Sequence, residues 1–254
     1  MRIVPGFPVI RTIRHARGPA RLRLVCFAHA GGNAFFSRTW SGLPDAVELM
    51  GVVMPGPGDP TAPSFRRVES LTAVLAASGS VFEEGPYALF GHSLGALIAF
   101  ELVREFRRRH RILPQSLFVS ACPAPQVRKV PQPIYHLPDD EFLSEIQRMN
   151  GTPAEVLRER DLMQVLMPRL RADFEMSAAY RYQVEPPLPC PIHAFGGSHD
   201  AEVTPAEIDA WRAQTSSHFA TAIIPGDHFF HQTHPREISE HMAAALARML
   251  SPAG

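Results

Sequence analysis

Several features that would assign a chain to other protein classes are scarce or missing in this sequence. Cysteine occurs only three times in 254 residues, and Cys26, Cys122 and Cys190 form no CxxC pair. Because each lies in or beside an apolar run, we predict small buried thiols in a reducing compartment rather than disulfides or a metal site. No apolar run is long enough to span a bilayer, and residues 1–18 lack the continuous core of a signal peptide. The sequence therefore predicts a cytoplasmic protein that does not bind membranes.

An excess of charge of one sign is missing as well, since 25 Lys and Arg residues balance 25 Asp and Glu residues. A balanced chain has no overall field that would steer it toward nucleic acid, so we expect no nucleic-acid partner and only local charge-guided docking. With 45% hydrophobic residues the chain can bury a large core. We therefore predict a single domain over residues 1–254, and we expect a monomer.

What the sequence does contain is a regular alternation of short apolar runs and longer stretches of helical period. This alternation is typical of an α/β fold, in which crossover helices join parallel strands and flank the sheet. Strands are predicted at Leu22–Ala28, Leu49–Met54, Tyr87–Phe90, Ser116–Ser120, Pro191–Phe195 and Thr221–Ile224. Helices are predicted at Val68–Val81, Leu94–Arg109, Thr204–Gln214 and Pro235–Leu250. At the start of the third helix, Thr204 and Glu207 have the spacing of a capping box.

The alternation stops between Pro123 and Pro189, where no convincing strand occurs. Three helical segments are predicted there instead, at Asp139–Met149, Pro153–Glu159 and Asp161–Tyr182. The insertion is too long for a plain crossover, so it is either extra cover for the core or a helical lid over a site at the sheet edge. In a lid, Met163, Met167 and Phe174 would contact the substrate, because flexible apolar side chains adapt to varied ligands.

A Gly-x-Ser-x-Gly sequence at Gly91–Gly95 follows a predicted strand and precedes a predicted helix. A serine on such a tight turn needs glycines on both sides, because Cβ atoms there would clash with the neighbouring strand and helix. The turn raises Oγ into a cleft at a helix N-terminus, where developing negative charge is favoured. We therefore predict that Ser93 is a nucleophile rather than part of an accidental turn.

A serine hydroxyl needs a base to take its proton, and in this fold an acid and a histidine follow the serine in that order. Asp200 follows the strand Pro191–Phe195, and His228 follows the strand Thr221–Ile224. Both loops are expected at the carboxyl edge of the sheet, which Ser93 also occupies. Asp227 is a rival acid, but a neighbour in sequence does not easily reach Nδ1 of His228.

Three histidines, His228, His231 and His234, have the spacing of a cluster of metal ligands. However, no carboxylate or thiol cluster accompanies them, Pro235 interrupts the pattern, and Ser93 would then lack a base. We therefore expect no metal and no organic cofactor.

An oxyanion formed on the substrate needs two N–H donors, one of them from the residue after the nucleophile. That residue is Leu94. We predict the N–H of Ala30 as the second donor, because Gly31 and Gly32 allow the backbone to pass close to a substrate. The alternative is that these glycines only turn the chain.

Several blocks of sequence together resemble the type II thioesterases, the stand-alone editing hydrolases of polyketide and nonribosomal peptide synthesis. They are HAGG at His29–Gly32, PGPGD at Pro55–Asp59, GHSLGA at Gly91–Ala96, GGSHD at Gly196–Asp200 and PGDHFF at Pro225–Phe230. This chain departs from the family pattern at Pro57, His199 and His231, where the family often has an arginine, an acidic residue and an apolar residue.

The resemblance implies an α/β-hydrolase fold with Ser93, Asp200 and His228 as the triad and Ala30 and Leu94 as oxyanion donors. It also implies that the substrates are acyl groups on the phosphopantetheine arm of acyl carrier or peptidyl carrier proteins. Those groups would be stalled or wrongly primed units.

Three other functions remain open on the sequence alone. The closest is an oxyester hydrolase on the same scaffold, although HAGG in place of the HGGG of many esterases favours a thioesterase. A terminal thioesterase domain is less expected, because the chain begins with its own Met and carries no upstream carrier domain. A non-catalytic binding protein would require a broken triad.

The basic run Arg104–Arg111 either complements the end of its helix or forms a docking patch for acidic carrier proteins.

Overall fold

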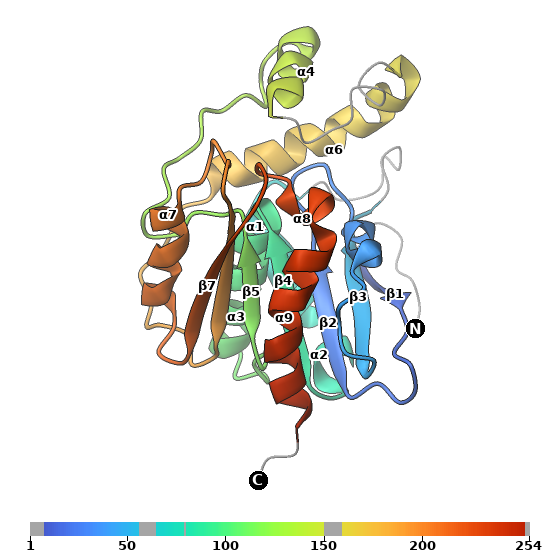
Figure 1. Ribbon diagram of the computed structural model, residues 1–254. Helices are drawn as coiled ribbons and strands as arrows, with labels where there is room; N and C mark the ends of the chain where they lie inside the picture. Colours follow the sequence, from blue (N-terminus) through green and yellow to red (C-terminus); the bar gives the residue numbers. More distant parts are fainter. Residues whose placement is uncertain (1–7, 56–64, 79, 150–158, 252–254) are drawn as a thin grey trace.

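The computed structural model describes residues 8–55, 65–78, 80–149 and 159–251. Seven strands form one sheet in the order β1-β3-β2-β4-β5-β6-β7 (Figure 1). Their bounds are β1 Val9–Arg14, β2 Leu22–Phe27, β3 Val47–Val53, β4 Tyr87–His92, β5 Leu117–Ser120, β6 Ile192–Gly197 and β7 Phe219–Ile224. Strand β1 pairs with β3 in the antiparallel sense, and the other neighbours are parallel. The predicted α/β architecture is therefore confirmed, and the six predicted strands correspond to β2 through β7.

The edge strand β1 is the one strand that the sequence analysis missed among the described residues. Polar residues interrupt its apolar ones at Arg11, Thr12 and Arg14, and most of its side chains are only half-buried. An edge strand covered on one side lacks the continuous apolar run of a central strand, and such a run was the signal used for the others.

The helices flank the sheet on both faces, and each face has its own core (Figure 1). Helices α1 Val68–Ala77 and α3 Leu94–Arg108 pack on one face, and α9 Pro235–Leu250 packs on the other. The alternation along β4 sends Leu89 into the first core and Ala88 and Phe90 into the second. The sequence of a strand that is buried on both faces is one continuous apolar run, which explains why the central strands were predictable.

Two of the predicted helices are divided in the structure. Residues of the predicted helix Val68–Val81 form α1 and the short α2 Ser80–Glu83. The predicted helix Thr204–Gln214 consists of α7 Pro205–Asp209 and a 3₁₀ helix, η2 Ala210–Gln214. The capping box at its start is confirmed, because Thr204 Oγ1 accepts the Glu207 N–H at 3.3 Å and the Glu207 carboxylate accepts the Thr204 N–H at 2.9 Å.

The insertion contributes α4 Asp139–Arg148 and α6 Arg160–Ala179, and α6 crosses the end of the sheet beneath α4 (Figure 1). A small separate core joins these elements, formed by Ile134, Phe142, Ile146, Met163 and Leu170. The helix predicted at Pro153–Glu159 falls almost entirely outside the described residues. Helix α6 ends three residues before the predicted Tyr182, because the backbone at Tyr180 is extended.

The three cysteines are buried, as predicted, and burial raises the pKa of the Cys122 and Cys190 thiols to about 12. Buried thiols held protonated in this way are poor nucleophiles. In the described ranges of the chain, no helix combines the length and apolar character needed to cross a bilayer.

Candidate active site

Ser93 occupies the turn between β4 and α3 in a strained backbone conformation. Its φ of 54° and ψ of −117° lie in a region that residues with a Cβ rarely adopt. Strain of this kind costs on the order of 1–3 kcal/mol and persists where the surroundings enforce it. Here the Ser93 N–H donates to the Ser120 carbonyl of β5 at 2.8 Å, which ties the turn to the neighbouring strand.

The flanking glycines are required by packing. A Cβ on Gly91 would lie closer than 3.0 Å to the backbone of Gly95, and a Cβ on Gly95 would lie closer than 3.0 Å to the Phe27 carbonyl of β2. No side chain fits at either position without moving backbone. The Gly-x-Ser-x-Gly pattern therefore reflects the close crossing of α3 over β2 and β4.

The loops after β6 and β7 bring Asp200 and His228 together. His228 Nδ1 lies 2.9 Å from Asp200 Oδ2, and the Asp200 side chain is fully buried. The other carboxylate oxygen, Oδ1, accepts the N–H groups of Glu202 at 2.8 Å and Val203 at 3.1 Å. These bonds fix the carboxylate in one orientation, with Oδ2 directed at the imidazole.

The rival acid, Asp227, has a different hydrogen-bond role. Its Oδ1 accepts the Phe229 N–H at 2.8 Å, a local contact that shapes the turn carrying His228. Burial lowers the pKa of His228, but the hydrogen bond and the charge of Asp200 outweigh burial and raise the pKa above its ordinary value. Asp200 thus favours a proton on the ring, as the partner of a catalytic base must.

Ser93 and His228 line one cavity of about 600 Å³ at the carboxyl end of the parallel strands. Ala30 and Leu94, the predicted oxyanion residues, line the same cavity. The insertion contributes apolar wall residues, namely Ile134, Ile146, Met149, Leu170 and Phe174. The exposed Lys129, the only lysine in the sequence, also lies on the cavity wall.

Of the three residues predicted to contact a substrate from the lid, one lines the cavity in the structure. Phe174 lies on the cavity wall, but Met163 belongs to the small core beneath α4, and Met167 packs against that core. Met163 and Met167 are not among the described residues that line this cavity, so their contact with a substrate stays a prediction. Met163, Met167, Leu170 and Phe174 recur every three or four residues and share one face of α6, and Leu170 and Phe174, which line the cavity, lie nearer the C-terminal end of the helix.

The loop after β2 forms a tight turn over His29–Gly32. The Gly32 N–H donates to the His29 carbonyl at 3.0 Å, and Gly31 has a φ of 72°, which favours glycine. The Gly31 N–H donates to Asp173 Oδ2 of α6 at 2.8 Å. Among the described residues, the Ala30 N–H has no acceptor, so it is available to a ligand in the cavity.

Sequence reasoning missed Asp173 and Arg169, which contact this turn from α6. Their only signal in the sequence was an oppositely charged pair spaced i, i+4 on a helix. Most such pairs are exposed, whereas the Asp173 side chain is 9% exposed and lies against the loop after β2.

Two buried histidines, His92 and His231, and the half-buried His29 lie beside His228. The His92 and His231 rings are 3.7 Å apart between centroids, and the His92 and His228 rings are 5.5 Å apart. Burial lowers the pKa of all three, that of His29 to about 4, so they are neutral at pH 7. In the part of the chain that the structure describes, no group of three His, Cys, Asp or Glu side chains is arranged to hold a metal.

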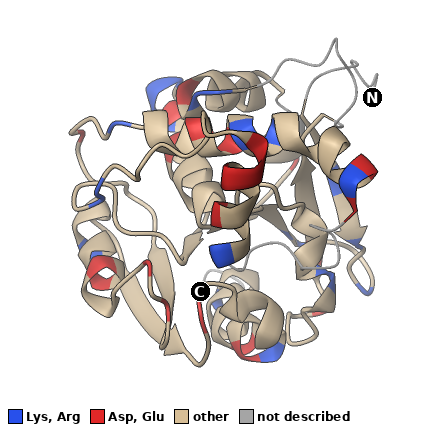
Figure 2. Ribbon diagram, turned by 90° about the horizontal axis from the view of Figure 1, so that it is seen from above, with Lys and Arg blue, Asp and Glu red and all other residues tan. Residues whose placement is uncertain are grey.

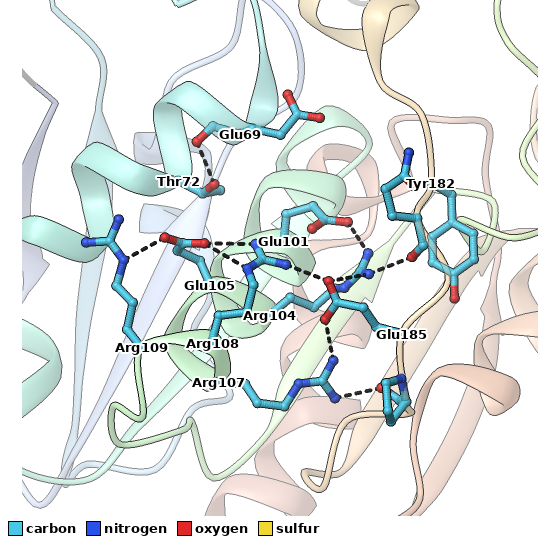
Figure 3. A network of polar contacts seen from close by, with 12 residues as sticks. Glu69, Thr72, Glu101, Arg104, Glu105, Arg107, Arg108, Arg109, Tyr182 and Glu185 are labelled. Atoms are coloured by element: carbon cyan, nitrogen blue, oxygen red, sulfur yellow. Dashed lines mark hydrogen bonds and ion pairs between the residues drawn. The ribbon is translucent and has the colours of Figure 1, made fainter.

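The basic run at the end of α3 forms an ion-pair network (Figure 3). Its contacts, at 2.6–2.9 Å, join Arg104 to Glu101 and Glu185, Arg107 to Glu185, Arg108 to Glu105 and Glu185, and Arg109 to Glu105. The helix begins at Leu94 and extends about 1.5 Å per residue, so these charges lie roughly 20 Å from the cavity. The network favours a structural role for this run over the docking patch considered from the sequence.

Helix α4, at the end of the molecule that carries the cavity, has acidic residues in its first turn and the basic Arg148 in its last. Figure 2, a view from above, shows both acidic and basic residues on the ribbon at this end.

Comparisons with known proteins find relatives over most of the chain. The family model described as thioesterase domain matches residues 22–246. The gramicidin S biosynthesis protein GrsT of Aneurinibacillus migulanus is 39% identical over 235 residues, which is 92% of each chain. Thioesterase PikA5 of Streptomyces venezuelae is 36% identical over 94% of this chain and 88% of its own. The structure of BorB, a type II thioesterase from the borrelidin biosynthetic cluster, superposes with a TM-score of 0.82 at 34% identity, covering 93% of this chain and 97% of that one.

Proposed function

Because the chain belongs to the thioesterase family and is a hydrolase of acyl thioesters, we propose that Ser93, His228 and Asp200 form its catalytic triad. The observation that carries this proposal is the 2.9 Å contact between His228 Nδ1 and the buried Asp200, with Ser93 and His228 on one cavity wall.

In the proposed reaction, His228 Nε2 takes the proton of Ser93 as Oγ attacks the thioester carbonyl carbon. The N–H groups of Ala30 and Leu94 then bind the oxyanion. When the carbon–sulfur bond breaks, His228 gives its proton to the departing thiolate, which leaves a covalent acyl ester on Ser93. A water molecule attacks this ester with His228 again as base, which releases the acid and restores the hydroxyl.

We further propose that the substrates are stalled or aberrant acyl groups on the phosphopantetheine arm of acyl or peptidyl carrier proteins. GrsT is named for gramicidin S biosynthesis and BorB for the borrelidin biosynthetic cluster, and this chain covers most of the length of both. In assembly lines of this kind, phosphopantetheine arms carry the intermediates. The cavity is large enough for an acyl chain and has an apolar wall formed by the insertion. In this proposal residues 123–189 act as a lid on a single domain.

The experiment compares hydrolysis of one acyl group on a carrier protein, on coenzyme A and on a matched oxyester. We expect the highest kcat/KM on the carrier protein and the lowest on the oxyester. Equal efficiency on carrier protein and coenzyme A would refute the carrier proposal, and a preference for the oxyester would favour an esterase.

The control is Ser93→Ala, which removes the nucleophile. It should keep the wild-type circular dichroism spectrum and lose both turnover and labelling by a fluorophosphonate probe. Turnover retained by purified, folded Ser93→Ala protein would refute the triad.

A further inference from the structure

We propose that Asp173 of α6 is a positioning residue for the oxyanion hole and that Arg169 supports it in this role. The pair would hold the His29–Gly32 turn in the form that directs the Ala30 N–H into the cavity. This inference rests on the proposed function, because it takes Ala30 as an oxyanion donor.

Two contacts connect α6 to consecutive residues of the turn. Asp173 Oδ2 accepts the Gly31 N–H at 2.8 Å, and Arg169 Nη2 donates to the Gly32 carbonyl at 2.8 Å. The two side chains are one helical turn apart, and Arg169 Nε lies 3.7 Å from Asp173 Oδ2. One charged pair on the helix therefore binds a backbone donor and a backbone acceptor of the same turn.

The orientation of the Ala30 N–H depends on these contacts through the planarity of peptide groups. The Ala30 N–H and the His29 carbonyl belong to one peptide plane and point in opposite directions. The His29 carbonyl is held by the Gly32 N–H at 3.0 Å, and Gly32 is in turn held by Arg169. Fixing the turn at Gly31 and Gly32 therefore fixes the direction of the donor on Ala30.

The Asp173 carboxylate also selects one orientation of the peptide that follows Ala30. In the observed orientation this peptide presents the Gly31 N–H to the carboxylate. If the peptide turned over, the Ala30 carbonyl oxygen would face the carboxylate instead, and two acceptors would oppose each other. An acceptor that is buried and ionised disfavours such a flip strongly.

Packing between the helix and the turn adds a steric restraint. A Cβ on Gly31 would lie closer than 3.0 Å to Leu170, the buried residue between Arg169 and Asp173 on α6. Asp173 and Arg169 also share a small cavity of about 30 Å³ with His29 and Leu94. The pair is thus next to both segments that supply the proposed oxyanion donors.

The charges of the pair compensate each other where negative charge would hinder catalysis. Asp173 is buried beside the turn, and an isolated carboxylate there would oppose the oxyanion. Burial raises the pKa of Asp173, whereas the charge of Arg169 and the hydrogen bond from Gly31 favour its ionised form. Arg169 therefore allows the carboxylate to bind the turn without adding net charge near the reacting carbonyl.

The experiment compares Asp173→Ala and Asp173→Asn with the wild type. Glu175→Ala is the matched control, because Glu175 lies on the same helix and pairs with Arg66 rather than with the turn. On a short acyl thioester we expect Asp173→Ala to lower kcat about 10- to 100-fold with little change in KM, by analogy with loss of an oxyanion donor. Asp173→Asn keeps an acceptor for Gly31 and should restore most of kcat.

A second readout separates positioning from general destabilisation. A trifluoromethyl ketone forms an oxyanion on Ser93, so its affinity should fall by the same factor as kcat in Asp173→Ala, whereas the affinity for the product acid should stay constant. If Asp173→Ala does not fold, Arg169→Met supplies the test. We expect it to lower kcat and the affinity for the ketone together, by a smaller factor than Asp173→Ala.

The inference is overturned if folded Asp173→Ala keeps wild-type kcat, or if the affinity for the ketone is unchanged. It is also overturned if Glu175→Ala shows the same losses. These outcomes are distinct from failure of the proposed function, in which the wild type itself would show no hydrolysis dependent on Ser93.

Discussion

Asp200→Asn is the substitution whose effect the hydrogen bonds of the site define most fully. Asn has the shape of Asp, and its carbonyl oxygen can replace Oδ1 as acceptor of the Glu202 and Val203 N–H groups. The amide nitrogen then occupies the place of Oδ2 and directs an N–H at His228 Nδ1, 2.9 Å away in the wild type. To avoid two opposed donors, His228 must carry its proton on Nε2, the atom that has to accept the proton of Ser93.

The size of the loss of kcat in Asp200→Asn follows from the hydrogen bonds that the substitution removes. A hydrogen bond to a charged group is worth about 1.5–3 kcal/mol, and an unmatched buried donor costs about 1–3 kcal/mol. Recovering the productive tautomer in the variant therefore costs about 2.5–6 kcal/mol, which corresponds to a loss of roughly 10²- to 10⁴-fold in kcat. Thermal stability should change little, since the two backbone N–H groups keep their acceptor.

The assay is thiol release from an acyl pantetheine thioester over a range of pH. In the wild type the raised pKa of His228 places the acid limb of kcat/KM above the pH expected for an ordinary histidine, and activity rises with pH through that pKa. In Asp200→Asn the limb should move to lower pH, because the group that raises the pKa has lost its charge.

Asp227→Asn is the control, since Asp227 Oδ1 binds the Phe229 N–H rather than the imidazole. It should retain most of the activity. A larger loss in Asp227→Asn than in Asp200→Asn would refute this assignment of the acid.

Two further predictions concern the cavity wall and the buried histidines. Phe174→Ala should shift preference toward longer or bulkier acyl chains, measured as kcat/KM over a chain-length series, whereas Met163→Ala should lower the melting temperature without shifting preference. His231→Phe should raise the free energy of unfolding by about 1–3 kcal/mol at pH 7, measured by urea denaturation, because both ring nitrogens of the buried His231 lack a partner among the described residues. The pKa of His231 is lowered in the folded protein, so the unfolded chain binds a proton on this residue first as the pH falls below about 6.5, and stability is lost. His231→Phe removes this group and should therefore lose less stability in acid than the wild type does. A variant that is less stable than the wild type both at pH 7 and in acid would contradict this account.

The parts of the fold and site that the sequence predicted depend on local constraints. Strands buried on both faces gave continuous apolar runs, and the turn from β4 into α3 requires Gly91, because a Cβ there would meet the backbone of Gly95 a few residues on. The positions of Asp200 and His228 followed from topology, because parallel strands end at one edge.

The parts that were missed depend on contacts between distant segments. Asp173 is 142 residues from Gly31 in sequence, and no pattern within α6 indicates that its carboxylate meets that turn. The same limit applies to the cavity wall. Residue type and helical period place Met163, Met167 and Phe174 on one face of α6, but they do not show which part of that face reaches the cavity and which part packs against α4.

The single lysine on the cavity wall has a chemical consequence for a protein that handles activated acyl groups. Thioesters acylate unprotonated amines, and arginine, which supplies the other 24 basic residues, stays protonated and does not react in this way. Among the side chains of this sequence, Lys129 is therefore the only amine to which a substrate could lose its acyl group by aminolysis, and it lies on the cavity wall. Mass spectrometry of protein incubated with excess substrate would record such self-acylation at one side chain, which makes Lys129 an internal reporter of how long an acyl group stays at the cavity.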